Sequence, residues 1–260
     1  MQVISVSSLK GGVGKTTVTL GLASAAFALH LRTLVVDMDP QGDATTGLGV
    51  EHGTNQSIAE VLRDPRASTV ETVITPSGWT QDSVDVVDVI PGSPLAVNFD
   101  EPHPKARDLW RLEEALAHVE ADYDIVFIDC PPSLNALTQT AWTASDQVLI
   151  VSEPGLFSVA AAARALRAVA DANAERRDGE LRAAGIVINR FRPQSIEHQY
   201  RVSEIRDMFG DQVMDVQLPE RSSIQQVQGA ARPVHMWPGE ATQDMAHLFD
   251  RLLRNLLTHS

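Results

Sequence analysis

The sequence predicts one α/β domain, residues 1–260, built on a doubly wound and mostly parallel sheet with helices on both faces. Three observations predict this fold class. Short apolar, β-branched segments alternate with segments of helical periodicity, which is typical of parallel strands joined by crossover helices. The first apolar segment runs directly into a glycine-rich turn and a helical pattern. No repeat, low-complexity tract or Gly/Ser-rich linker divides the chain.

Strands are expected wherever a short segment is apolar and rich in β-branched residues, as strands covered by helices on both faces are. Seven segments meet this description. In chain order they are Val3–Ser7, Thr33–Val36, Val84–Ile90, Ile125–Ile128, Gln147–Val151, Ala184–Asn189 and Gln212–Val216.

Helices are expected between these strands, where apolar residues recur at helical spacing. They are Thr16–Leu29, Ser57–Leu62, Leu109–His118, Leu134–Ala144, Ser158–Glu175, Glu197–Phe209 and Thr242–Leu257. The segments Asp64–Ser83 and Pro91–Lys105, the second of which contains several prolines, are expected to be surface excursions.

The composition excludes several classes of protein. Hydrophobic residues make up 43% and charged residues 21% of the chain, which excludes collagen, coiled coils and disordered chains. The formal charge is −13, from 34 acidic and 21 basic side chains, so binding to nucleic acid or anionic lipid requires a local basic patch. The single cysteine, Cys130, excludes an internal disulfide and is expected to be a small buried residue. No charged leader and no run of ~18 apolar residues is present, so we expect a cytoplasmic protein.

A phosphate-binding loop is predicted over residues 8–17, Ser-Leu-Lys-Gly-Gly-Val-Gly-Lys-Thr-Thr, between the first strand and the first helix. Its glycines let backbone N–H groups approach phosphate oxygens, and the helix start adds its own N–H groups and dipole. Lys15 supplies a charge for the β- and γ-phosphates, and the Thr16 hydroxyl a Mg²⁺ ligand. The loop departs from the ordinary Walker A pattern, because Leu9 stands where that pattern has glycine and Lys10 follows it. A simple tight turn is the alternative, but the order of strand, glycines, Lys-Thr and helix favours phosphate binding and a P-loop NTPase fold.

Acidic residues follow two of the predicted strands. Asp37 and Asp39 come at the end of the strand Thr33–Val36, and Asp129 at the end of Ile125–Ile128. Ligands of open α/β sheets bind beyond the carboxyl ends of the strands, so these acids are expected near the phosphate loop. There, a carboxylate either holds Mg²⁺ or its waters, or orients a water in line with the γ-phosphate. The sequence leaves open whether Asp37 supports the residues of the site or is a purely structural acid.

Three segments together resemble a known family. Residues 10–17, residues 36–49 (Val-Asp-Met-Asp-Pro-Gln-Gly-Asp-Ala-Thr-Thr-Gly-Leu-Gly) and residues 128–134 (Ile-Asp-Cys-Pro-Pro-Ser-Leu) are similar to the motifs of the deviant-Walker ATPases of the ParA/Soj partition family. The resemblance extends over the whole chain. The motifs are specific for the ParA/MinD superfamily and less so for one member of it.

The resemblance implies an ATP-dependent switch that cycles between an ATP-bound homodimer and a monomer with ADP or no nucleotide. Two subunits enclose two ATP molecules, and Lys10, the signature lysine of the family, reaches the phosphates held by the partner subunit. Catalytic roles are implied for Lys10, Lys15 and Asp39, and Mg²⁺ would be held by Thr16, Asp39 and Asp129. An ordinary solvated lysine is the alternative for Lys10, but the chain has few lysines besides the two that bracket this loop.

Base recognition is expected at the ends of two later strands. Asn189 ends the strand Ala184–Asn189, and its amide can donate to and accept from adenine; a turn asparagine is the alternative. Pro219 follows the last strand, where relatives pack a proline-containing segment on the base. The expected ATP-binding residues are therefore Lys10, Gly11, Gly12, Val13, Gly14, Lys15, Thr16, Thr17, Asn189 and Pro219.

Non-specific DNA binding is implied by the resemblance and is expected to depend strongly on salt, because it uses phosphate contacts. Arg190, Arg192 and Arg221 are the candidate contacts, although they do not match the arginine positions of many relatives. The alternative is that the arginines of this region pair with nearby acids on solvated faces. A ParB-like activator is the expected partner, and the protein would associate with the nucleoid if it binds DNA.

Two other functions stay open. A MinD-like or orphan ParA-like ATPase would position division machinery or another cargo without DNA, but Thr242–Leu257 lacks the basic face of a membrane-surface helix and is expected to pack on the sheet. A biosynthetic enzyme with the same loop would turn over quickly with a small-molecule acceptor and would not need Lys10 in the partner subunit. Slow basal hydrolysis is expected for the partition ATPase.

Overall fold

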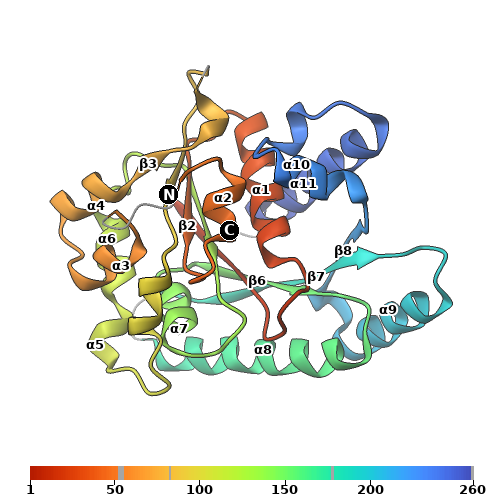
Figure 1. Cartoon of the computed structure of the whole chain (residues 1–260). Helices are drawn as coiled ribbons and strands as arrows, with labels where there is room; N and C mark the ends of the chain where they lie inside the picture. Colours follow the sequence, from red (N-terminus) through yellow and green to blue (C-terminus); the bar gives the residue numbers. More distant parts are fainter. Residues whose placement is uncertain (52–55, 82, 177–178, 259–260) are drawn as a thin grey trace.

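The computed structural model describes residues 1–51, 56–81, 83–176 and 179–258, and it contains one eight-stranded sheet (Figure 1). The strand order is β3-β4-β2-β5-β1-β6-β7-β8, and every neighbouring pair is parallel except β3 with β4. This confirms the predicted doubly wound, mostly parallel sheet. The strands are β1 (Gln2–Ser7), β2 (Thr33–Asp37), β3 (Thr75–Pro76), β4 (Val87–Ile90), β5 (Ile125–Asp129), β6 (Gln147–Ser152), β7 (Arg182–Phe191) and β8 (Val213–Pro219).

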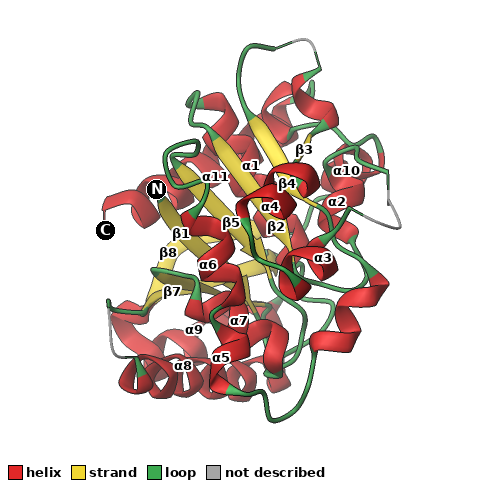
Figure 2. Ribbon diagram, turned by 90° about the vertical axis from the view of Figure 1, so that its left-hand side faces the viewer, coloured by secondary structure: helices red, strands yellow, loops and turns green. Residues whose placement is uncertain are grey.

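Helices cover both faces of the sheet, and each face has its own apolar core (Figures 1 and 2). One face is covered by α1 (Lys15–Ala28), α2 (Asp43–Gly47), α10 (Ser222–Gly229) and α11 (Glu240–Thr258). The other face is covered by α3 (Ile58–Arg63), α4 (Ala67–Val73), α6 (Arg111–Ala117), α7 (Ala136–Thr143), α8 (Leu156–Glu175) and α9 (Ile196–Phe209), with the short α5 (Ala106–Leu109) beside α7. Short 3₁₀ helices lie at Gly78–Thr80, Pro94–Phe99, Gly210–Gln212 and Val234–Met236.

The last helix packs on the sheet as expected. Met245, Leu252, Leu253 and Leu256 of α11 are buried, and α11 lies along α1. Within the described part of the chain, no helix combines the length and apolar composition that a membrane span needs.

The strand order brings the carboxyl ends of β1, β5 and β2 together at the centre of the sheet. Val6 of β1 and Asp37 of β2 are both register partners of Asp129 on β5, so the three residues form one row across the sheet. Neighbouring strands lie about 4.8 Å apart, so the two carboxylates are close neighbours. From β1 the chain turns to β2 on one side, while β6 lies on the other side, which creates the crevice where such sheets bind ligands.

The predicted excursion 64–83 differs from the observed structure. It contains α4, the two-residue strand β3 and the buried Trp79, whose indole N–H donates to the Gly47 carbonyl at 3.0 Å. The sequence did not predict these elements because the segment has no apolar periodicity of its own. Packing on α2 and α3 stabilises it instead. Val84, the expected start of β4, is 99% exposed, and the strand begins at Val87.

Candidate functional site

The predicted phosphate loop connects β1 to α1 in the manner that its glycines allow. Gly12 and Gly14 have φ of 78° and 88°, the left-handed region that favours glycine, and Gly14 immediately precedes α1. A Cβ atom at Gly14 would lie 2.3 Å from the Asn189 amide nitrogen, so a larger residue does not fit there. The loop therefore presents open backbone at the start of a helix, which is the arrangement that binds phosphate.

A cavity of about 410 Å³ opens above this loop. Its walls come from the loop and α1, from the segment between β2 and the end of α2, and from single residues at the ends of β5, β7 and α10. The lining includes Gly11, Gly12, Gly14, Lys15, Thr16, Thr17, Asp39, Gln41, Asp43, Pro132, Arg190 and Gln228. Most of the residues expected to bind phosphate are thus gathered around one space, together with Asp39.

Asp129 lies at the floor of the site and is completely buried. Thr16 donates its hydroxyl hydrogen to Oδ2 at 2.7 Å, and the Thr19 hydroxyl lies 2.9 Å from Oδ1. Burial raises the pKa of Asp129 to about 6, and the hydrogen bond from Thr16 and the charge of Lys15 oppose that rise. The structure therefore brings Thr16 and Asp129 into direct contact.

The same pair fits a magnesium ion. Hydroxyl and carboxylate oxygens are ligands that Mg²⁺ prefers, and this cation usually takes its other ligands from phosphate and water. Among the described residues, no three His, Cys, Asp or Glu side chains are grouped closely enough to hold a metal by themselves. The donor set fits Mg²⁺ carried with a phosphate ligand and does not resemble a closed metal cage.

Asp37 and Asp39, two residues apart, have different surroundings. Asp39 is half-buried and lines the cavity, and its Oδ1 accepts the Gln41 N–H at 3.0 Å. Asp37 is fully buried, and its Oδ2 accepts both the N–H of Thr45 at 2.8 Å and the hydroxyl of Thr45 at 2.7 Å. Asp37 thus holds α2 through Thr45, a contact that either a supporting or a purely structural acid can make.

The charge state of Asp37 is unusual. Burial and the nearby Asp129 carboxylate raise its pKa to about 8, against the hydrogen bonds from Thr45. Its other oxygen, Oδ1, has no hydrogen-bond partner among the described residues. Without nucleotide, a proton on Asp37 relieves the repulsion between two adjacent buried carboxylates.

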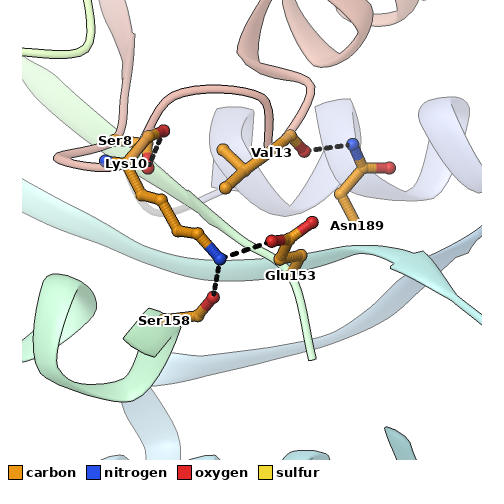
Figure 3. Close-up of polar contacts among 6 residues, drawn as sticks. All are labelled: Ser8, Lys10, Val13, Glu153, Ser158 and Asn189. Atoms are coloured by element: carbon orange, nitrogen blue, oxygen red, sulfur yellow. Dashed lines mark hydrogen bonds and ion pairs between the residues drawn. The ribbon is translucent and has the colours of Figure 1, made fainter. Parts of the chain in front are cut away.

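Lys10 does not line the cavity above its own loop, and its side chain runs toward Glu153 and Ser158 (Figure 3). Its ammonium group forms an ion pair with Glu153 at 2.5 Å and donates to the Ser158 hydroxyl at 3.4 Å. Glu153 follows β6 and Ser158 lies in the first turn of α8. The alternative of an ordinary solvated lysine does not describe this side chain, because Lys10 is about two-thirds buried and held by two partners.

Asn189 and Pro219 lie beside the loop, at a second and smaller cavity of about 120 Å³. The Asn189 amide group donates to the carbonyl of Val13 at 2.8 Å (Figure 3), so it also supports the phosphate loop from beneath. Gln228 of α10 lines both cavities and donates to the Thr17 hydroxyl at 3.0 Å. The sequence did not single out Gln228, because α10 lies in a polar segment without a clear apolar periodicity.

The candidate DNA-contacting arginines are placed in different ways. Arg192 forms an ion pair with Glu220, and Arg201, a further arginine of this region, pairs with Glu197 and Glu204. Arg190 lines both cavities, and Arg221 lines the smaller one. The alternative reading of paired surface charges is therefore observed at Arg192 and Arg201.

Glu153 was missed by the sequence reasoning, although a signal for it exists. It stands just beyond a predicted strand, in the same relation to the sheet edge as Asp39. Applying the strand-end rule to β6 as well as β2 and β5 would have placed an acid near the loop.

Comparisons with known proteins agree with this geometry. The family model AAA_31, described as an AAA domain, matches residues 1–180. The chromosome partitioning protein ParA of Myxococcus xanthus is 31% identical over 240 residues, which cover 91% of this chain and 81% of that protein. Among solved structures, an ATP complex of Cyanothece McdA has a TM-score of 0.82 at 19% identity and covers 98% of this chain and 96% of its own. Cobyrinic acid a,c-diamide synthase from Mycobacterium smegmatis, with an ATP analogue and magnesium, has a TM-score of 0.80 at 24% identity, covering 100% and 97%. These two structures show the fold.

Proposed function

The chain belongs to the family of ParA-type partition ATPases, and we propose that residues 1–260 work as one domain that binds ATP with Mg²⁺ and hydrolyses it to ADP and phosphate. The observation that carries the proposal is that Lys15 and Thr16 line one cavity beside a loop with glycines in the left-handed conformation, and that the Thr16 hydroxyl donates to the buried Asp129 carboxylate behind it. Structural neighbours that were solved with ATP or an ATP analogue support the choice of nucleotide.

Each residue of the cavity has a distinct task in this proposal. The loop N–H groups and the ammonium of Lys15 bind the β- and γ-phosphates. Thr16 and Asp129 supply oxygen ligands for Mg²⁺, which neutralises charge on the phosphate oxygens when it is bound. Asp39, on the opposite wall, orients the attacking water or a water of the metal.

The first experiment tests the nucleotide. Lys15→Ala should abolish ATP binding and hydrolysis, while Lys105→Ala, which removes an exposed lysine at the start of α5, should change neither. Asp39→Ala should bind ATP but not hydrolyse it. An unchanged hydrolysis rate in Lys15→Ala would overturn the ATPase proposal.

We propose further that ATP joins two subunits face to face and that Lys10 then contacts the phosphates of the partner's nucleotide. The position of Lys10 supports this, because its side chain lies outside the cavity of its own subunit. A lysine that gains contacts only in the ATP-bound dimer makes dimerisation sensitive to the γ-phosphate. If ATP-dependent dimerisation were unchanged in Lys10→Ala, this mechanism would be refuted.

The finer proposal is that the ATP-bound dimer holds DNA non-specifically and that a ParB-like partner accelerates its slow hydrolysis. Arg221 and Arg192 are the candidate contacts for DNA phosphates. We would measure binding of Asp39→Ala to long duplex DNA with ATP and with ADP at two salt concentrations. ATP-selective and salt-sensitive binding is expected.

A positioning ATPase that uses another matrix is the second candidate. The formal charge of −13 and the ion pairs at Arg192 and Arg201 favour it, because they leave less basic surface for DNA. An Asp39→Ala dimer that forms with ATP but binds no DNA in either nucleotide state would select this candidate.

A further inference from the structure

Arg190 stands where the two cavities of the site adjoin. The cavity of about 410 Å³ contains the phosphate loop, and the cavity of about 120 Å³ contains Asn189 and Pro219. Arg190, Thr17 and Gln228 line both. A ligand that extends from one cavity into the other must therefore pass Arg190.

The smaller cavity suits a flat heterocycle. Pro219, Ile224 and Met245 give it an apolar wall, and the rest of its lining is polar, with the amides of Asn189 and Gln225 and the charged Glu220 and Arg221. A ring that packs on the apolar wall can form hydrogen bonds with the amides. A nucleoside with its base in this cavity has its first phosphate at the junction and its outer phosphates over the loop.

The charges around the larger cavity single out Arg190. Among the described residues that line it, the cationic side chains are Lys15 and Arg190, and Asp39 and Asp43 are anionic. Lys10 is held by Glu153 instead. Lys15 serves the loop end of the larger cavity and Arg221 lines only the smaller one, so Arg190 is the cation that lines both cavities.

The guanidinium of Arg190 is not used by the fold. It is exposed and makes no hydrogen bond or ion pair with a described residue. Glu220 is near enough for Arg190 to help lower the pKa of that carboxyl, but Glu220 is held by Arg192. By contrast, Arg201 is engaged by two acids.

The backbone at Arg190 is strained. Its φ is 56°, and among the described non-glycine residues only His30 and Ala231 share a positive φ. This conformation is unfavourable for an arginine and is found where surrounding structure imposes it, often at binding sites. Arg190 lies near the end of β7, where the register of β7 with β8 shifts between Ile188 and Phe191.

We propose that Arg190 binds the nucleotide at the phosphate nearest the ribose, rather than DNA. The inference rests on the proposed ATP site and adds a contact to it. A guanidinium fork suits phosphate oxygens, and the contact is made to a phosphate that ATP and ADP share. Arg190 therefore strengthens binding of both nucleotides equally and leaves discrimination of the γ-phosphate to other residues.

The test is titration of wild-type protein and of variants with fluorescent analogues of ATP and ADP in the presence of Mg²⁺. Arg190→Gly removes the cation and relieves the backbone, whereas Arg190→Gln removes the cation and keeps the strain. Both should bind ATP and ADP about tenfold more weakly, with an unchanged ratio between them. Arg190→Lys should lose less, because it keeps the charge without the fork. Arg164→Gln, an exposed arginine of α8, is the matched control and should bind as wild type.

Three results would overturn the proposal. If both Arg190→Gly and Arg190→Gln bound the nucleotides with wild-type affinity, Arg190 would make no contact with the nucleotide. A loss for ATP alone would place Arg190 at the γ-phosphate instead. Normal nucleotide binding together with a loss of DNA binding would show that Arg190 contacts DNA instead. Failure of the underlying ATP site is distinguishable, because wild-type protein would then bind neither nucleotide.

Discussion

The ion pair between Lys10 and Glu153 makes a prediction about dimerisation. In the proposed ATP-bound dimer, Lys10 must leave Glu153 and Ser158 to reach the partner's nucleotide, so the pair opposes dimer formation. Glu153→Gln removes the negative charge and leaves a neutral amide of the same shape. The variant should therefore dimerise more readily with ATP than the wild type does.

The magnitude follows from the exposure of the pair. The side chains of Lys10 and Glu153 are 32% and 27% exposed, which is intermediate between surface and buried pairs. An ion pair of this kind contributes about 0.5–1 kcal/mol. Each dimer breaks two such pairs, one per subunit, so the dimer should gain about 1–2 kcal/mol. That gain corresponds to a dimer dissociation constant about 5- to 30-fold lower.

Sedimentation velocity at saturating ATP and Mg²⁺ measures this constant, with Asp39→Ala in every protein to prevent hydrolysis. Glu197→Gln is the control, because it weakens a comparable pair with Arg201 on α9 and should leave dimerisation unchanged. The Glu153→Gln effect should disappear in combination with Lys10→Ala. Equal or weaker dimerisation of Glu153→Gln would refute the reasoning, since Glu153 would then not compete for Lys10.

Three further predictions concern the fold and the loop. Gly14→Ala should lower the unfolding free energy by about 2 kcal/mol and abolish ATP binding. The new Cβ would collide with the Asn189 amide, and the backbone φ of 88° is unfavourable for alanine. An unchanged ATP affinity in calorimetry would contradict this prediction. Without nucleotide, the unfolding free energy should fall as pH rises from about 4 to 8, because the pKa of Asp37 is raised to about 8 and the folded protein keeps a proton that the unfolded chain releases. Asp37→Asn should flatten that dependence in urea titrations at several pH values, and an equal slope in both proteins would exclude Asp37 as its source. Phe249→Ala should cost about 3–5 kcal/mol by urea unfolding, since the ring is 1% exposed and packs tightly on Gly21 of α1; a loss below 1 kcal/mol would indicate that α11 contributes little.

The sequence predicted the elements that are long or periodic and missed the short ones. The seven predicted strands all exist, and β3 was missed because it has two residues and depends on its pairing with β4. The helices α2, α4, α5 and α10 were missed because none of them has a long apolar stripe. They are held by contacts from elsewhere, such as the Trp79 indole on Gly47 at the end of α2.

The phosphate loop was determined by the sequence alone, because its chemistry is local. Strand, glycines, Lys15, Thr16 and helix are consecutive, and the glycine conformations follow from the absence of a side chain. The sheet-edge rule also brought Asp129 to this loop, since parallel strands end at a common edge.

The partners of individual charged side chains were decided only by the tertiary structure. Lys10 and Glu153 are 143 positions apart, and Thr16 and Asp129 are 113 apart. A strand-end rule gives the edge of the sheet but not the direction in which each side chain points. Asp37 therefore turned to Thr45, Lys10 to Glu153 and Arg190 to the junction of two cavities, because the groups around each side chain come from other elements that only folding brings together.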